Sequence, residues 1–151
     1  MELQNIKNEL VNILTATKKS DDITPLFKAI FDYVPSEIST INSYPCGVVL
    51  IGDGEESPDD SASNTISQPF DIYLFLKKKK EASAHENFLI EILERFLFEL
   101  RKKANVDTLN GFSDVFQISW ERTSFFDEGR SAGVGWLVRI IFEKNIYFSD
   151  I

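Results

Sequence analysis

The residues of this chain that could do chemistry are few and scattered. His85 is the only histidine and Cys46 the only cysteine. A histidine can act as a general base or bind a metal, but no second histidine is present to complete a zinc site. Cys46 precedes an apolar run and has no evident base partner, so we expect a small buried residue and not a nucleophile. We expect His85 to be exposed at the start of a helix.

Scattered carboxylates such as Asp71 and Glu121 are the remaining candidates for acid–base chemistry. They lie in separate predicted strands, and the strand pattern gives them opposite or undefined directions. General acid–base catalysis requires groups held within reach of one substrate, and nothing in their spacing provides that. The sequence therefore predicts a protein that is not an enzyme, with no cofactor, no metal and no small-molecule substrate.

Acidic side chains gather in one short segment of the chain. They are Asp53, Glu55, Glu56, Asp59 and Asp60. The order of ligands that defines an EF-hand calcium loop is absent. Residues 53–67 are mostly acidic or small and polar, so we expect a mobile, solvated surface loop. Placed around a ring, such loops would make a negative field that repels wrong partners and admits basic ones.

Two further motifs have an ordinary structural explanation. The basic run Lys77, Lys78, Lys79 and Lys80 could contact phosphate, but lysines at the end of a strand more often keep a sheet edge soluble. The glycines of residues 129–135, GRSAGVG, do not form a phosphate-binding loop, because no Gly-Lys-Ser follows and a strand continues where a helix start is needed. We expect a flexible hairpin there.

Length and composition indicate one ordinary globular domain, residues 1–151. Sixteen basic and 24 acidic residues give a net charge of −8, which opposes binding to the phosphate backbone of nucleic acids. The first ten residues lack the apolar core of a signal peptide, and no apolar run is long enough for a membrane span. The thirteen phenylalanines favour a dense core or a buried interface. We expect a soluble protein that does not associate with membranes.

Two helices are predicted from apolar residues that recur at helical spacing. One covers residues 2–18. The other covers residues 83–104 and opens with Ser83 and Glu86, the S-x-x-E pattern of a capping box. Its apolar stripe predicts that it covers a sheet.

Alternating or apolar runs predict the strands. Residues 27–33 favour a strand, with a short helix from Pro25 as the alternative. Further strands are expected at residues 46–52, 68–77, 115–126 and 134–148, with turns at residues 105–114 and 127–133. Neighbouring strands joined by turns pair antiparallel. The sequence thus predicts an α+β fold, with a mostly antiparallel sheet of about four to five strands packed on one face by two helices.

This order of segments resembles a known family, the tail terminator or tail-completion proteins of long-tailed bacteriophages (the minor tail protein U-like, head–tail connector group). The features that carry the resemblance are the N-terminal amphipathic helix, FDYVP at residues 31–35, YPCGVVL at 44–50, a polar loop, QPFDIYLFL at 68–76, and the helix and strand pair that follow.

The resemblance implies a small α+β subunit that assembles with itself into a ring, commonly a hexamer. Such a ring caps the tail tube and contacts the tail tube protein and the head–tail connector proteins, while DNA passes through an acidic lumen. It also implies assembly in the bacterial host cytoplasm and a final location in the virion, at the tail or neck. The acidic residues 53–60 would then face the lumen.

Interface residues are expected among exposed apolar side chains near strand ends. The candidates are Phe125, Phe126, Tyr147 and Phe148, with burial in the core as the alternative for each. A different function also fits the sequence. The chain could be a non-catalytic adaptor or inhibitory module that uses its acidic segment to bind a basic partner.

Overall fold

The computed structural model describes residues 2–34, 44–77, 82–104, 115–127 and 130–150. The elements in chain order are α1 (Leu3–Ala16), β1 (Ala29–Phe31), β2 (Cys46–Ile51), β3 (Glu55–Pro58), β4 (Ser63–Lys77), α2 (Ala82–Ala104), β5 (Val115–Asp127), β6 (Arg130–Tyr147) and a short 3-10 turn, Phe148–Asp150. The predicted turn at residues 105–114, with Asn110 and Gly111, lies outside the described residues.

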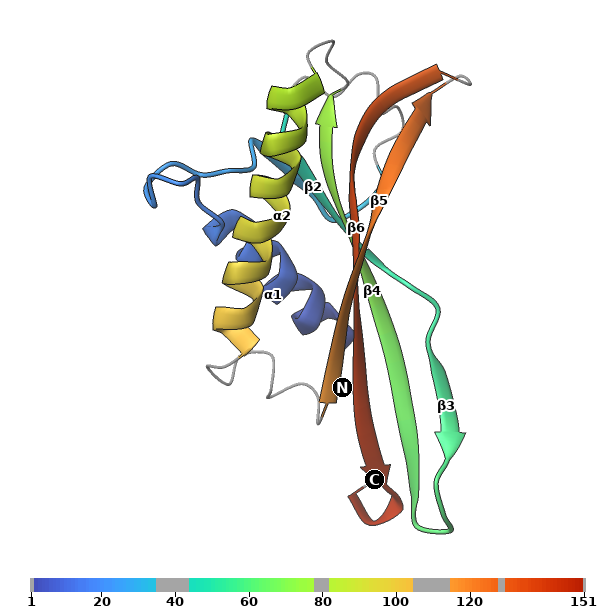
Figure 1. The fold of residues 1–151 in the computed structure, drawn as a ribbon. Helices are drawn as coiled ribbons and strands as arrows, with labels where there is room; N and C mark the ends of the chain where they lie inside the picture. Colours follow the sequence, from blue (N-terminus) through green and yellow to red (C-terminus); the bar gives the residue numbers. More distant parts are fainter. Residues whose placement is uncertain (1, 35–43, 78–81, 105–114, 128–129, 151) are drawn as a thin grey trace.

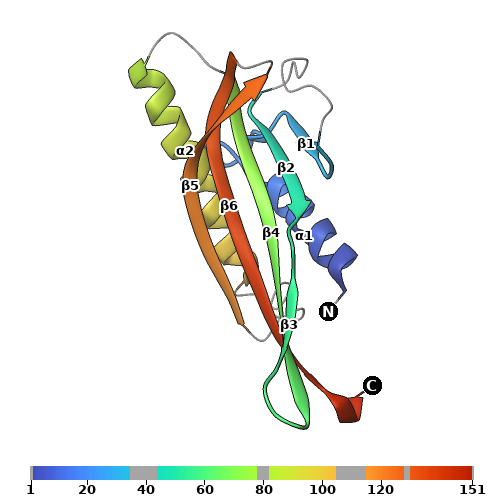
Figure 2. The ribbon, with the colours of Figure 1, turned by 90° about the vertical axis from the view of Figure 1, so that its right-hand side faces the viewer.

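The strands form one six-stranded sheet in the order β1-β2-β4-β6-β5, and β3 pairs with β4 beside this path. All neighbouring strands are antiparallel except β1 and β2. Both helices lie on the same face of the sheet (Figures 1 and 2). The predicted α+β fold is confirmed, with six strands where the sequence predicted four to five.

The core lies between this sheet face and the two helices. Alternate residues of β4 and β6 point into it, among them Phe70 and Phe142, whose rings meet edge to face with centroids 5.8 Å apart. Phe96 of α2 is fully buried against the same cluster. Burying one such side chain contributes about 2 kcal/mol, so the predicted apolar stripe of α2 is what attaches the helix to the sheet.

A second, smaller cluster lies on the opposite sheet face, at the β1 end. Cys46, Val48 and Phe75 are buried there, beside Phe31 and Tyr73. The register places Cys46 opposite Phe75 and Val48 opposite Tyr73, so these side chains share one face. Cys46 is therefore a buried packing residue, as predicted.

Arg95 of α2 fastens the segment that follows α1. Its Nε donates to the carbonyl of Lys18 (2.8 Å), and Nη2 donates to the carbonyl of Lys19 (2.7 Å) and to the Asp22 carboxylate. Within that turn, the hydroxyl and amide of Thr24 and the amide of Ile23 donate to Asp21 and lower the pKa of its carboxyl to about 2. The guanidinium thus joins α2 to the backbone of the turn that follows α1.

Several sequence predictions need correction. The strand expected at residues 27–33 exists but is short, β1 (Ala29–Phe31). Residues 53–67 are not a loop: they contain β3 and the start of β4. The turn expected at residues 127–133 is narrower, because β6 already begins at Arg130. In these segments, backbone pairing with a neighbouring strand outweighs a polar or glycine-rich composition.

The predicted capping box is also wrong. Ser83 lies inside α2 and not ahead of it. The Glu86 carboxylate instead accepts two hydrogen bonds from the Arg122 guanidinium on β5, one of them 2.7 Å long. These hydrogen bonds stabilise the charged carboxylate and so lower the pKa of Glu86. A bidentate charged partner is also a stronger donor than the backbone amide of a capping box.

Gly135 explains part of the glycine-rich segment. It lies on β6 opposite Phe75, and a Cβ at this position would lie 1.8 Å from the carbonyl oxygen of Leu74. The nearest atoms all belong to the backbone of β4, so they cannot move aside without distorting the central strand pair. This glycine is required for close strand packing and not for binding phosphate.

Gly135→Ala should therefore lower the free energy of unfolding by about 3 kcal/mol, because the added methyl group forces β6 away from β4. Urea denaturation followed by circular dichroism measures this. The control is Ser119→Ala, an exposed position on β5, for which a change within about 0.5 kcal/mol is expected. Equal stability of Gly135→Ala and the wild type would contradict the packing described here.

Candidate functional site

The most distinctive surface of the molecule is a narrow extension of the sheet, here called the ribbon. It consists of β3, residues 63–67 of β4 and residues 143–147 of β6, paired in the order β3-β4-β6. It extends beyond the end of α2, and neither helix covers it (Figures 1 and 2). The ribbon is therefore accessible to a partner from both faces.

The turn at the end of the ribbon is built by an acidic side chain. Asp60 Oδ1 accepts hydrogen bonds from the amides of Ala62 (2.7 Å) and Ser63 (3.0 Å). The amide of Phe148 donates to the carbonyl of Ala62 (2.9 Å), which joins the C-terminal residues to the same turn. A carboxylate that caps its own turn in this way makes a short connection stable.

Polar side chains tie the strands of the ribbon together. Asn64 donates to Glu56 (2.8 Å), and the Thr65 hydroxyl donates to Asp59 (2.6 Å) and lies 2.8 Å from Asn145 Oδ1. At the base, Gln68 is buried and its Nε2 donates to the carbonyl of Gly52 (2.8 Å). Sequence reasoning missed these strands, although Ser63, Thr65 and Ser67 alternate with Asn64, Ile66 and Gln68 at strand spacing.

All the predicted acidic residues lie on the ribbon or at its base. Asp53, Glu55, Glu56, Asp59 and Asp60 are exposed. The described residues contain no group of histidine, cysteine, aspartate or glutamate side chains that could hold a metal ion. The ribbon is a negatively charged surface with a defined strand geometry.

The faces of the ribbon differ. The register places Glu55 opposite Ser67, Ser57 opposite Thr65, and Ser63 opposite Tyr147, so Glu55, Ser57 and Tyr147 share one face, here called the outer face because it continues the helix-free face of the sheet. The Asp59 carboxylate reaches this face through its contact with Thr65. Glu56 and Lys144 alternate to the other face.

The predicted interface residues divide into two groups. Tyr147 and Phe148 lie at the end of the ribbon with 51% and 46% of their surface exposed. Phe125 and Phe126 lie near the end of β5, on either side of a bulge, opposite Gly133 and Ser131 of β6; their side chains lie outside the described part. Tyr147 and Phe148 are thus available for contacts.

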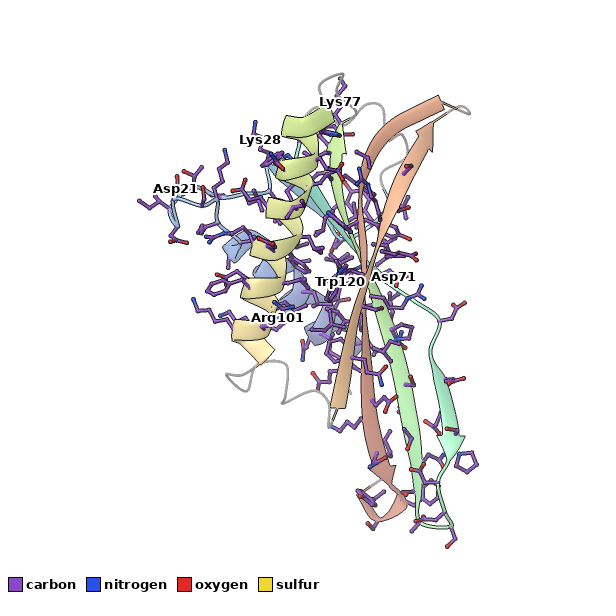
Figure 3. The ribbon with its side chains drawn as sticks, viewed as in Figure 1. Asp21, Lys28, Asp71, Lys77, Arg101 and Trp120 are labelled. Atoms are coloured by element: carbon purple, nitrogen blue, oxygen red, sulfur yellow. The ribbon has the colours of Figure 1, made fainter. Side chains whose placement is uncertain are left out.

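A second exposed surface, which the sequence analysis did not single out, lies on α2. Phe98, Arg101 and Lys102 follow one another at i, i+3 and i+4, so they share one side of the helix. All three are exposed, Phe98 by 56%, and the Arg95 guanidinium lies over the Phe98 ring, 5.9 Å from its centroid. We call these four residues the basic helix face; Figure 3 shows Arg101 on it.

The structure defines the surroundings of the candidate catalytic residues Cys46 and His85. Cys46 is fully buried, and burial raises the pKa of its thiol to about 12, so the thiol stays protonated and weakly reactive at neutral pH. His85 is half-buried, and its Nε2 is shielded with no hydrogen-bond partner among the described residues. The prediction of an exposed His85 is therefore wrong. His85 lies in the first turn of α2.

Asp71 and Glu121 lie on the same sheet face, which corrects the prediction of opposite directions. The register sets Asp71 and Ser119 on either side of Arg139, and Glu121 opposite Leu137. Arg139 holds Asp71 in a bidentate ion pair (2.7 and 3.2 Å). Ser119, Trp120, Glu121, Leu137 and Arg139 line a shallow, open pocket of about 140 Å³. The Arg139 guanidinium that lines this pocket is already paired with Asp71.

Lys77 is exposed at the end of β4 (Figure 3), and Lys78, Lys79 and Lys80 lie outside the described residues.

Within the described ranges, no helix combines the length and apolar character needed to cross a bilayer. The sequence matches no family model. It also matches no curated protein at a significant level. These comparisons therefore assign no role to the ribbon or to the basic helix face.

Asp60→Ala should destabilise the ribbon, because two amides and a hydroxyl lose their acceptor. We expect a loss of about 1 kcal/mol in unfolding free energy and faster amide exchange at Ala62 and Ser63. Asp53→Ala is the matched control, since it removes an exposed charge without a turn contact. Equal exchange in both variants would show that Asp60 does not hold the turn.

Cys46 should resist thiol reagents in the folded protein. We expect its reaction with a maleimide at pH 8 to be at least about 100-fold slower than in urea, because the folded thiol is buried and protonated. Mass spectrometry of timed samples measures the modified fraction. Rapid labelling of the native chain would contradict the burial of this residue.

Proposed function

We propose that the protein is a structural subunit that assembles with copies of itself into a ring, and that the ring is a tail terminator or head–tail joining component of a phage or prophage. The observation that carries the proposal is the ribbon, a stiff, uncovered extension with exposed aromatic and acidic side chains at its end. The order of elements that resembles tail terminators supports the phage assignment.

The edges of the sheet favour contacts between copies. β5 is an edge strand of thirteen residues, and among the described strands only β6 pairs with it. It carries Trp120, which is 47% exposed. Long exposed edge strands readily pair with another chain. The opposite edge consists of β1 and β3, so the two edges differ, and contacts between unlike surfaces form a ring when the rotation between copies closes.

The acidic ribbon suits a channel for DNA. Its exposed carboxylates repel phosphate, so DNA of like charge would pass without sticking. In this arrangement Asp53, Glu55, Glu56, Asp59 and Asp60 face the lumen or a neighbouring subunit. The partners are other copies of the chain, the tail tube protein and the head–tail connector, and the ring resides in the virion.

A second function is supported by the same exposed carboxylates. A single copy could insert the ribbon into a basic partner as a non-catalytic adaptor or inhibitor, since a preformed strand pair binds with little ordering cost. Self-association separates the two proposals, because an adaptor of this kind acts as a monomer.

Native mass spectrometry across protein concentrations tests the ring. We expect one dominant closed oligomer, a hexamer, which binds purified tail tubes at one end in negative-stain images. A strict monomer at every concentration, together with no binding to tail tubes, would contradict the proposal.

A further inference from the structure

We propose that the outer face of the ribbon binds the basic helix face of a second copy, so that each subunit contributes one surface to each neighbour. This inference rests on the self-assembly proposed above and adds to the sheet edges a contact between two named surfaces. The contact joins Glu55, Asp59 and Tyr147 of one copy to Phe98, Arg101 and Lys102 of the next.

The two surfaces are complementary in charge. Glu55 and Asp59 give the outer face of the ribbon its negative charge, while Arg101 and Lys102 are exposed in the last turns of α2. The ion pairs found among the described residues are Arg95–Asp22, Arg122–Glu86 and Arg139–Asp71. Of these residues, only Arg95 belongs to one of the two surfaces, and it lies at the margin of the basic helix face. Complementary charges of this kind steer encounter and fix the orientation of a contact.

The two surfaces are also complementary in apolar character. Tyr147 and Phe98 each leave about half of their surface exposed. Basic residues in the last turn of a helix are common because they interact favourably with the helix dipole, but this does not explain the exposed phenylalanine one turn before them. Aromatic and arginine side chains together are typical of the centres of protein interfaces.

The geometry requires a second molecule. The ribbon leads away from the body of its own chain, beyond the end of α2 (Figure 1), so its tip cannot reach the basic helix face of the same copy. A contact between two different surfaces is head-to-tail, and it generates a ring when the rotation between copies closes.

Charge reversal tests the contact. Glu55→Lys and the pair Arg101→Glu with Lys102→Glu should each weaken assembly at least about tenfold, because each brings like charges together. The triple variant, in which both surfaces are reversed, should recover assembly to within about threefold of the wild type. Native mass spectrometry measures the oligomer fraction, and circular dichroism checks the fold of each variant.

Matched controls separate contact from net charge. Glu56→Lys makes the same charge change on the other face of the ribbon; because it also removes the hydrogen bond from Asn64, its fold is compared with that of Glu55→Lys by circular dichroism. Lys28→Glu changes an exposed residue far from both surfaces (Figure 3). Both should assemble like the wild type. If Glu55→Lys assembles like Glu56→Lys, or if the triple variant is not rescued, this inference is wrong even though the ring exists. A monomeric wild type would instead refute the proposed function.

A cross-link provides a readout that does not depend on charge. Ser57→Cys places a thiol on the outer face of the ribbon, and Arg101→Cys places one on the basic helix face. The native Cys46 is buried. A short bis-maleimide should join the two variants only when they are mixed. Cross-linking of either variant alone at the same yield, or none in the mixture while the oligomer persists, would overturn the proposed contact.

Discussion

The rest of the structure depends on the pairing of β4 with β6. All fifteen residues of β4 have a partner in β6, from Ser63 opposite Tyr147 to Lys77 opposite Gly133. The pair lies in the middle of the sheet, and it continues beyond the part of the sheet that the two helices cover (Figure 1). Phe70 of β4, Phe142 of β6 and their neighbours line the core beneath α2, and the five pairs from Ser63 to Ser67 continue as the ribbon. A single ladder therefore couples the stable core to the exposed surface, and Gly135 permits the close approach on which it depends.

This arrangement separates the side chains that stabilise the fold from those exposed on the ribbon. The apolar side chains that hold the fold together lie between the helices and the sheet, whereas the ribbon is held by a capped turn and by polar contacts between strands. Little of the ribbon's surface is needed to fold the domain. Its acidic and aromatic residues are thus exposed to a potential partner, and because three hydrogen-bonded strands are already ordered, such a contact would carry a low entropy cost.

Much of the fold could be predicted from periodicity. The apolar stripe of α2 and the alternation of Phe70, Ile72, Leu74 and Leu76 identified the core face correctly, because burial on one side leaves a clear period in the sequence. Burial of Cys46 followed from its apolar neighbours. The ribbon was missed because both of its faces are solvated, so residues 55–67 carry no apolar period. The ion pairs of Glu86 with Arg122 and of Asp71 with Arg139 were also missed. The first joins α2 to β5 and the second joins neighbouring strands, so both depend on the tertiary arrangement.

The proposed assembly is tested most directly by hydrogen exchange, measured at a low concentration where a monomer is expected and at a high concentration where the proposed ring is expected. Ring formation through the ribbon should slow exchange in two separate segments, residues 55–67 of the ribbon and residues 95–103 of α2, and leave residues 28–32 unchanged. Protection confined to other parts of the molecule, with both of these segments unchanged in the assembled state, would contradict the claim that the ribbon is a surface for building rings.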